Sequence, residues 1–544
     1  MLENRIVERS DFRLLMAYPN FTKMFTPSYA VGLFTTILKN QGYDIDLFDC
    51  TPYLTSYNPQ NMPNPQVLTQ KLMSNKPVNP EFFQDVKTDL FGDFRKKLND
   101  FKPYAVVFST VVEDTWPQAR DMLKVLHDEY PQVKTLVGGV YSTMVPQQVI
   151  ASPYAQVVGF GEGEETIVDF CEAARKGEPL TNILGTFAKD ESGKTIYNFP
   201  RKVIDINQSP IPDFSLFDRN RFKRPLGRPN PATEDGMWRA VPIETYRGCP
   251  YTCTFCNSPI QKELAEKREQ GDFLRRKSMD NLRKEITTLL EKNDGDFLYI
   301  NDDAFMARPI PEIDAFIEMY DTIRDSKGKH IPFWMQTRFE DIRDEGQLAR
   351  LKQVGLHHAS FGLEHGNEEF RKQKLKRNIS NEKMIEKARI IQRVGVPYQI
   401  NVIIGMPYET RDLVFDTIEL TREVGGFDAI APNLFMPYKG TKLREMALEE
   451  KWLDPEAQTS SFVGASLLRM PRPYLQENEM VALQRTFRFY AEFPKNRWPE
   501  IERVEMLLAA DASEAEAEWG KLRDEFYQQK WGITESERKL TYAG

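Results

Sequence analysis

Two series of short apolar runs, each alternating with helical patterns, constrain the fold of this chain more than any other feature. The strand-like runs of the first series are 11–19, 44–49, 105–110, 134–139 and 156–161, and helical patterns lie near 28–41 and 116–129. Strands that alternate with helices indicate a parallel, doubly wound sheet. Such a sheet binds ligands at the carboxyl ends of its strands.

The second series begins at residue 241 and has six strand-like runs: 241–247, 297–302, 331–338, 357–364, 397–405 and 428–437. Helical patterns fit between them, for example 381–394, where Ser380 is a predicted N-cap and Gly395 a predicted terminator. Helical patterns continue at 474–494 and 500–530. The predicted fold class is therefore α/β, with two α/β units followed by a mostly helical C-terminal region.

Three thiols, Cys249, Cys253 and Cys256, lie within eight residues. A structural zinc site needs four protein ligands, and the next histidine, His330, is more than seventy residues further on. Disulfides need paired cysteines and an oxidising compartment. A [4Fe–4S] cluster normally takes four thiolates, so three would leave one iron open to a substrate or cofactor. We favour the cluster over zinc and over unrelated buried thiols.

The remaining cysteines, Cys50 and Cys171, are far apart in the sequence. Two thiols are too few for a second cluster that takes three or four thiolates. We expect both to be small buried hydrophobic residues.

The spacing C-x3-C-x2-C resembles the signature of the radical SAM superfamily. Arg247-Gly248-Cys249-Pro250 is similar to the lead-in of its cobalamin-linked branch, and Phe255 matches an aromatic residue near the adenine. The resemblance implies a partial (βα)6 TIM-like barrel, with a [4Fe–4S] cluster on Cys249, Cys253 and Cys256. It also implies that the open iron binds S-adenosylmethionine (SAM).

Polar residues at the strand ends match other SAM-binding positions of that family. Besides Phe255, the resemblance implies SAM contacts from Asp302, Asp303, Arg338, Glu364, Gly405 and Glu409. Each carboxylate could instead be a helix N-cap or part of a salt bridge. His365 is a departure from the family pattern, and we consider it either a proton shuttle or a packed or solvent-facing imidazole.

The first unit resembles the cobalamin-binding, Rossmann-like domain of B12-dependent radical SAM proteins, over about residues 11–220. The cobalamin-binding residues that this implies are Phe21, Thr22, Lys23, Ser109, Thr110, Gly138, Gly139, Ser142, Gly161, Glu162 and Gly163. The D-x-H-x-x-G motif is absent, and no histidine precedes His127. We therefore expect cobalt without a histidine lower ligand.

The resemblance also implies a division of the chain into a cobalamin domain, a linker, a radical SAM barrel and a helical C-terminal domain. The predicted bounds are 1–220 with an insertion at about 51–100, 221–240, 241–454 and 455–544.

We expect a B12-dependent radical SAM enzyme, with C-methylation of a small-molecule substrate as the favoured reaction. Oxidative cyclisation or ring rearrangement on the same scaffold is the alternative, and a non-catalytic cobalamin or redox sensor is a third. A flavodoxin or ferredoxin is the expected reducing partner.

Charge and hydropathy exclude some other roles. The net charge is −8 and the pI about 5.6, which gives no general attraction to nucleic acid or to anionic membranes. No apolar run reaches the roughly 18 residues of a membrane helix, and the first residues lack the apolar core of a secretory signal. We expect a cytoplasmic location, which suits free thiols.

Overall fold

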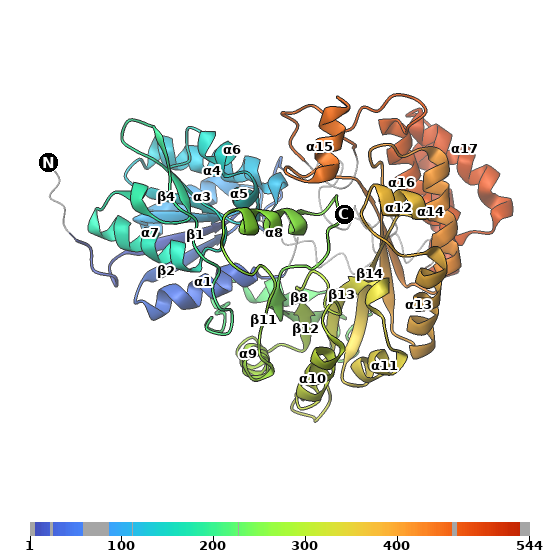
Figure 1. Cartoon of the computed structure of the whole chain (residues 1–544), viewed down its shortest axis with the longest axis horizontal. Helices are drawn as coiled ribbons and strands as arrows, with labels where there is room; N and C mark the ends of the chain where they lie inside the picture. The colour runs from blue at the N-terminus through green and yellow to red at the C-terminus, as the bar shows by residue number, and fades with distance from the viewer. Residues whose placement is uncertain are drawn as a thin grey trace.

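A computed structural model of the chain describes residues 6–21, 26–57, 86–110, 112–226, 228–459 and 465–533. Within this part, two seven-stranded sheets organise the molecule, and a separate two-stranded ribbon falls between β9 and β12 of the second sheet in the sequence. In Figure 1 the blue-to-cyan lobe holds the first sheet, the green-to-orange part holds the second, and the red elements are C-terminal helices.

The first sheet has the strand order β2–β1–β3–β4–β5–β6–β7. Its strands are β1 (Arg13–Tyr18), β2 (Asp44–Asp49), β3 (Ala105–Ser109), β4 (Lys134–Gly138), β5 (Val157–Gly159), β6 (Thr186–Lys189) and β7 (Thr195–Tyr197). The five strands that the sequence predicted pair in parallel, while β6 and β7 add an antiparallel edge that it did not predict.

Helices cover both faces of this sheet, as its sequence pattern requires. They are α1 (Tyr29–Asn40), α3 (Leu90–Phe101), α4 (Trp116–Glu129), α5 (Val140–Met144), α6 (Pro146–Ala151) and α7 (Glu164–Lys176). Alternate residues of β1 enter different cores: Leu14 and Met16 face one, and Leu15 and Ala17 the other. The predicted insertion at about 51–100 contains α3, so its last part belongs to the domain.

The second sheet is an open half-barrel with the order β16–β15–β14–β13–β12–β9–β8. Its strands are β8 (Lys223–Arg224), β9 (Trp238–Ile243), β12 (Phe297–Ile300), β13 (Phe333–Arg338), β14 (Leu356–Glu364), β15 (Tyr398–Ile404) and β16 (Ala429–Leu434). The six predicted strands are parallel, and β8 pairs antiparallel at the edge. The predicted linker at 221–240 is thus partly strand, because β8 and the start of β9 fall within it.

The helices that connect and flank these strands follow the sequence prediction closely. They are α8 (Asn257–Lys267), α9 (Met279–Lys292), α10 (Ile310–Tyr320), α11 (Glu345–Gln353), α12 (Glu368–Gln373), α13 (Asn381–Val394), α14 (Arg411–Val424) and α15 (Lys442–Glu449). Ser380 caps α13 through the amide of Lys383, and Gly395 ends it with a left-handed backbone, as predicted.

The C-terminal helices are α16 (Glu477–Glu492), α17 (Trp498–Ala509) and α18 (Ala515–Trp531). α16 lies against α14 in the orange and red part of Figure 1, and α17 packs against α16 and α18. Gln484 of α16 donates to the carbonyl of Pro432 in β16 at 2.8 Å, and Phe487 and Tyr490 are buried in the same cluster as the barrel strands. These helices therefore share the core of the barrel.

None of the helices in the described ranges combines the length and the apolar composition that crossing a lipid bilayer requires.

Candidate active site

The cysteine loop, residues 248–256, connects a two-stranded ribbon to a helix. The ribbon pairs β10 (Tyr246–Arg247) with β11 (Arg275–Arg276), and α8 begins directly after Cys256. A side chain at Gly248 would place its Cβ 2.8 Å from the carbonyl oxygen of Phe273, so only glycine fits there. All three thiols of the loop are partly exposed, whereas Cys50 and Cys171 are fully buried.

The three thiols are close enough to affect one another electrostatically. Burial raises the pKa of Cys249 and Cys256 to about 12, and charge on Cys253 adds to both effects. Burial also raises the pKa of Cys253, while the guanidinium of Arg338 opposes that rise.

A single metal ion does not suit this geometry. In the described ranges, no three His, Cys, Asp or Glu side chains converge as one ion would require. A [4Fe–4S] cluster spreads its thiolates over several irons, so its ligands need not meet at one point. The donor set therefore suits a cluster better than zinc.

The neighbouring carboxylates Asp302 and Asp303 lie in different environments. Asp302 is buried, and its oxygens accept from the amides of Thr245 (2.8 Å) and Tyr246 (3.3 Å), the Thr245 hydroxyl and Arg308 (2.9 Å). These four bonds use the usual acceptor capacity of a carboxylate. Burial raises the pKa of Asp302 to about 6, although Arg308 opposes it. Asp302 thus holds the backbone that leads into the cysteine loop.

Asp303 has acceptor capacity to spare. It accepts from the hydroxyl of Ser258 at 2.9 Å, and burial raises its pKa. Its charge also acts on the thiols of Cys249 and Cys256. Of the two carboxylates, Asp303 is the better placed to accept from a ligand beside the cysteine loop.

Arg338 and Glu364, at the ends of neighbouring strands, lie on the Cys253 side of the loop. The Arg338 guanidinium stacks 3.6 Å above the ring of Tyr251, and its Nη1 lies 3.9 Å from Cys253 Sγ. Glu364 has a positive φ of 67°, and burial raises its pKa. Two predicted SAM contacts are thereby brought to the same thiol.

Arg377, which the sequence analysis did not single out, connects this group. It is buried, lies 3.6 Å from Glu364 and donates to Glu340 at 2.9 Å and to the carbonyl of Gly362 at 2.6 Å. It belongs to a basic run, Lys374–Arg377, of the kind that usually lies on a solvent-exposed surface. No local pattern distinguishes the one buried cation in that run.

His365 and Glu409 form a buried pair below the strand ends. His365 stacks on Phe370, accepts from the amide of Asn367 at Nδ1 and places Nε2 3.1 Å from Glu409. Glu409 also accepts from the amides of Gly405 and Met406. The geometry favours a structural role for Glu409, which holds the backbone at Gly405 and Met406, and a packed imidazole at His365. The role of His365 as a proton shuttle remains a prediction.

A cavity of about 580 Å³ joins the two sheets. Its walls include Ser109, Gly138 and Gly161 from the first sheet and Gly248 and Asp303 from the second. The carboxyl ends of β3, β4 and β5 and of β9 and β12 therefore open into one space, next to the cysteine loop, whereas Arg338, Glu364 and the three thiols are not part of its lining. No histidine is among the described residues that line it.

The predicted cobalamin-binding residues divide into three groups. The cavity is lined by Ser109, Gly138, Gly139, Gly161, Glu162 and Gly163. Thr110 and Ser142 are instead buried beside it, where their hydroxyls lie 3.2 Å apart, and Thr143 rather than Ser142 reaches the wall. Phe21 is not part of the lining, and Thr22 and Lys23 lie outside the described residues.

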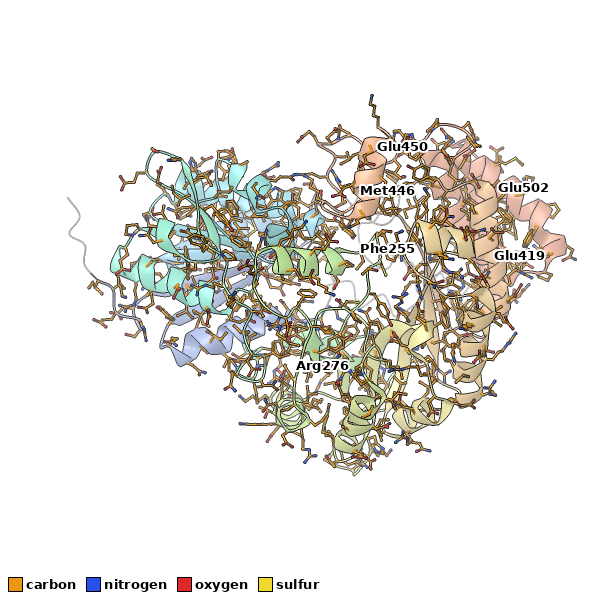
Figure 2. All side chains as sticks on the ribbon, viewed as in Figure 1. Phe255, Arg276, Glu419, Met446, Glu450 and Glu502 are labelled. Carbon is orange, nitrogen blue, oxygen red and sulfur yellow. The ribbon has the colours of Figure 1, made fainter. Side chains whose placement is uncertain are left out.

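Phe255 lies at the junction of the cysteine loop and α8, near the middle of the molecule (Figure 2). Its ring is partly buried and packs against the main hydrophobic cluster.

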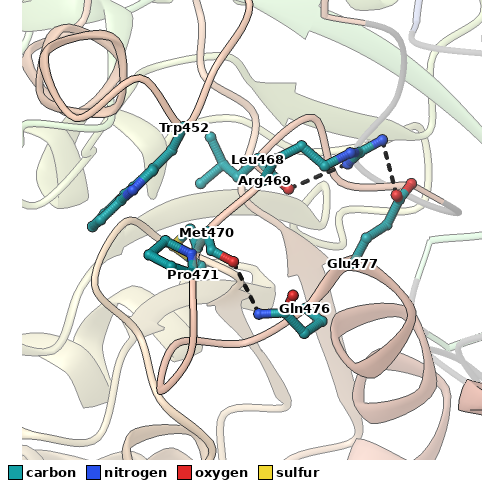
Figure 3. Close-up of a pocket in the computed structure, with 7 residues that line it drawn as sticks. All are labelled: Trp452, Leu468, Arg469, Met470, Pro471, Gln476 and Glu477. Carbon is teal, nitrogen blue, oxygen red and sulfur yellow. Dashed lines mark hydrogen bonds and ion pairs between the residues drawn. The ribbon is translucent and has the colours of Figure 1, made fainter.

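A second cavity, of about 400 Å³, belongs to the C-terminal region. It is lined by Trp452, Leu468, Arg469, Met470, Pro471, Gln476 and Glu477 (Figure 3). Arg469 pairs with Glu477 at 2.9 Å, and Gln476 donates to the carbonyl of Met470. It contains none of the residues predicted from the sequence.

Two family models match the chain where the two sheets lie. The B12 binding domain model matches residues 83–170, and the radical SAM superfamily model matches residues 243–421. The chain thus carries a B12 binding domain followed by a radical SAM domain, the pair of domains that cobalamin-dependent radical SAM enzymes have.

Two curated relatives and one solved structure illustrate the range of similar proteins. An uncharacterized methyltransferase of Pyrococcus horikoshii, PH0819, is 27% identical over 67% of this chain and 73% of its own. The anaerobic magnesium-protoporphyrin IX monomethyl ester cyclase of Rubrivivax gelatinosus is 23% identical over 63% of this chain and 58% of its own.

The solved structure is that of OxsB, a cobalamin-dependent SAM radical enzyme, with aqua-cobalamin and SAM bound. It superposes with a TM-score of 0.62 at 14% identity, over 96% of this chain and 71% of its own. This likeness concerns the fold.

Proposed function

We propose that the protein is a B12-dependent radical SAM C-methyltransferase that acts on a small molecule. One observation carries this proposal: the ends of both sheets, including the glycines of the first and the cysteine-loop flank of the second, line one cavity. The two matched domains thereby share a single space in which a substrate can meet both cofactors.

The chain's own residues would hold three groups there. Cys249, Cys253 and Cys256 would bind a [4Fe–4S] cluster, and the glycines at the ends of β4 and β5 would admit cobalamin. Among the SAM contacts, Arg338 would pair with the carboxylate of SAM and Asp303 would accept from its ammonium. Phe255, Gly405 and Glu364 complete the proposed SAM site.

When bound, the cluster would cleave SAM reductively to a 5′-deoxyadenosyl radical, and cobalamin would carry the methyl group. The protein would orient these groups toward one substrate carbon. Apolar residues form most of the cavity wall and would exclude water from the radical. A flavodoxin or ferredoxin of the cytoplasm would supply the electrons.

The test is an anaerobic incubation of the reconstituted, reduced protein with trideuteromethyl-SAM and a cell extract. We expect one product heavier by three deuterons, together with 5′-deoxyadenosine and S-adenosylhomocysteine. The matched control carries alanine at all three thiols of the cysteine loop and should form none of them. Steady formation of 5′-deoxyadenosine without any labelled product would contradict methylation.

Oxidative cyclisation is the second candidate, because a curated relative of this chain is a porphyrin cyclase. The same incubation separates the two reactions. A cyclase would consume substrate and form 5′-deoxyadenosine without stoichiometric S-adenosylhomocysteine.

A further inference from the structure

Glu162 comes from the predicted cobalamin-binding loop after β5, but its carboxylate binds the two-stranded ribbon of β10 and β11. It accepts from Arg247 at 2.9 Å, from Arg275 at 2.5 and 2.9 Å, and from the amide of Ile204 at 2.9 Å. Its neighbours Gly161 and Gly163 line the cavity. Glu162 therefore connects the part of the cavity wall that the first sheet supplies to the part that the ribbon of β10 and β11 supplies.

The two arginines stand opposite each other on the ribbon that begins the cysteine loop. Arg247 of β10 pairs in register with Arg275 of β11. Only Gly248 separates Arg247 from Cys249. A displacement of Glu162 would thus be transmitted to Cys249 through Arg247 and the backbone of Gly248.

Arg247 forms ion pairs with three carboxylates. It lies 2.6 Å from Glu164 and 3.0 Å from Glu244, in addition to its bond with Glu162. Its side chain is only 16% exposed, and those of its partners are between 9% and 21% exposed. Ion pairs this deeply buried hold their geometry tightly, because breaking one leaves an uncompensated charge.

Residues on both sides of the Glu162–Arg247 ion pair also line the cavity. Gly161 and Gly163 line it from one side, and Arg247 and Gly248 line it from the other. A ligand that fills the cavity would press on both groups together. The same charges would then hold the glycine loop and the cysteine loop in a fixed relation.

We propose that Glu162 and Arg247 are positioning residues that couple the two cofactor sites, so that a cluster in the cysteine loop tightens cobalamin binding and cobalamin secures the cluster. This inference rests on the proposed cofactors and adds a physical connection between them. By linkage, each group must stabilise the other's site by the same factor.

The experiment measures the dissociation constant of hydroxocobalamin for the full-length protein, anaerobically, before and after reconstitution of the cluster. The ratio of the two constants is the readout, since a merely structural role would weaken both states equally. Glu162→Gln and Arg247→Lys are the test variants, and circular dichroism checks that they fold. Gln148→Ala is the matched control, because Gln148 accepts from Lys439 at 2.7 Å and so joins the same two lobes elsewhere.

Coupling between sites is typically about 5- to 150-fold. We expect the parent and Gln148→Ala to show a ratio of at least about fivefold, and both test variants to approach one. As the reciprocal readout, hydroxocobalamin should slow the loss of iron to a chelator in the parent and not in Glu162→Gln.

A parent ratio of one, or an unchanged ratio in Glu162→Gln, would overturn the coupling while leaving the cofactors in place. Failure of the parent to bind hydroxocobalamin in either state would instead overturn the cofactor assignment, and the coupling with it. If Glu162→Gln does not fold, Glu162→Asp keeps the charge, shortens the reach by one methylene and is judged by the same ratio.

Discussion

Gly138 and Gly139, adjacent at the end of β4, should respond to alanine in opposite ways. At Gly139 a Cβ would lie 2.2 Å from the carbonyl oxygen of Thr110, and the backbone φ is +108°. A left-handed backbone costs a side chain about 1–2 kcal/mol, and forcing an extra methyl into packed atoms costs about 1–3 kcal/mol. Gly139→Ala should therefore destabilise the protein by about 2–5 kcal/mol.

At Gly138 the Cβ would meet nothing closer than the Phe108 carbonyl at 3.9 Å, so the fold accepts it. That methyl would occupy the cavity instead. A clash worth about 1–3 kcal/mol weakens binding by roughly 5- to 150-fold. Gly138→Ala should thus keep its stability and lose hydroxocobalamin affinity.

Gly193→Ala is the control for backbone strain alone, because its φ is +82° and nothing lies within 4 Å of its Cβ position. The assays are the thermal midpoint of the cofactor-free protein and a titration with hydroxocobalamin. The reasoning is refuted if Gly139→Ala is no less stable than Gly193→Ala, or if Gly138→Ala binds hydroxocobalamin as the parent does.

Three further predictions follow from the charges and thiols. Changing all three thiols of the cysteine loop to alanine should abolish iron incorporation after reconstitution, as measured by iron and sulfide analysis, whereas alanine at Cys50 should not change it. Arg377→Met removes the nearest cation from Glu364 and leaves Glu340 paired with Arg338 alone. It should cost about 3 kcal/mol, the lower end of the range for a broken buried ion pair, and weaken SAM binding. A fall in thermal midpoint smaller than the one that about 1 kcal/mol of destabilisation produces would contradict this. Burial raises the pKa of Asp114 to about 7, against an unfolded value near 4. The folded state then binds more protons between about pH 4 and 7, so this group's contribution to stability is lost as pH rises through that window. Asp114→Asn should flatten the fall in thermal midpoint from pH 5 to 8, while the same change at exposed Asp44 should leave it unaltered.

The sequence predicted the parallel strands well because each is a continuous apolar run between clear helical patterns. It did not predict β6 and β7, since an edge pair of four and three residues leaves too short a pattern to recognise. The sequence did not indicate β8 within the predicted linker for the same reason, because that strand has only two residues.

The site was harder to predict in its details than in its location. The cysteine spacing indicated the thiols, and the family resemblance indicated the strand-end carboxylates. Neither could show that the oxygens of Asp302 are fully used by protein donors while those of Asp303 are not. Glu162 illustrates the same limit. Its motif indicated a ligand contact, whereas two partners of its carboxylate come from the two-stranded ribbon beside the cysteine loop and are 85 and 113 residues away.

The helix that follows Cys256, α8, favours negative charge at the cysteine loop. The first amides of α8 have no partner within the helix, and the positive end of its dipole points toward the thiols. Burial raises the pKa of Cys256, and the nearby backbone amide of Ser258 opposes that rise. An inorganic centre bound there gains negative charge when it is reduced, and this end of the helix favours that gain. The first turn of α8 would therefore help the centre to accept the electron with which turnover starts.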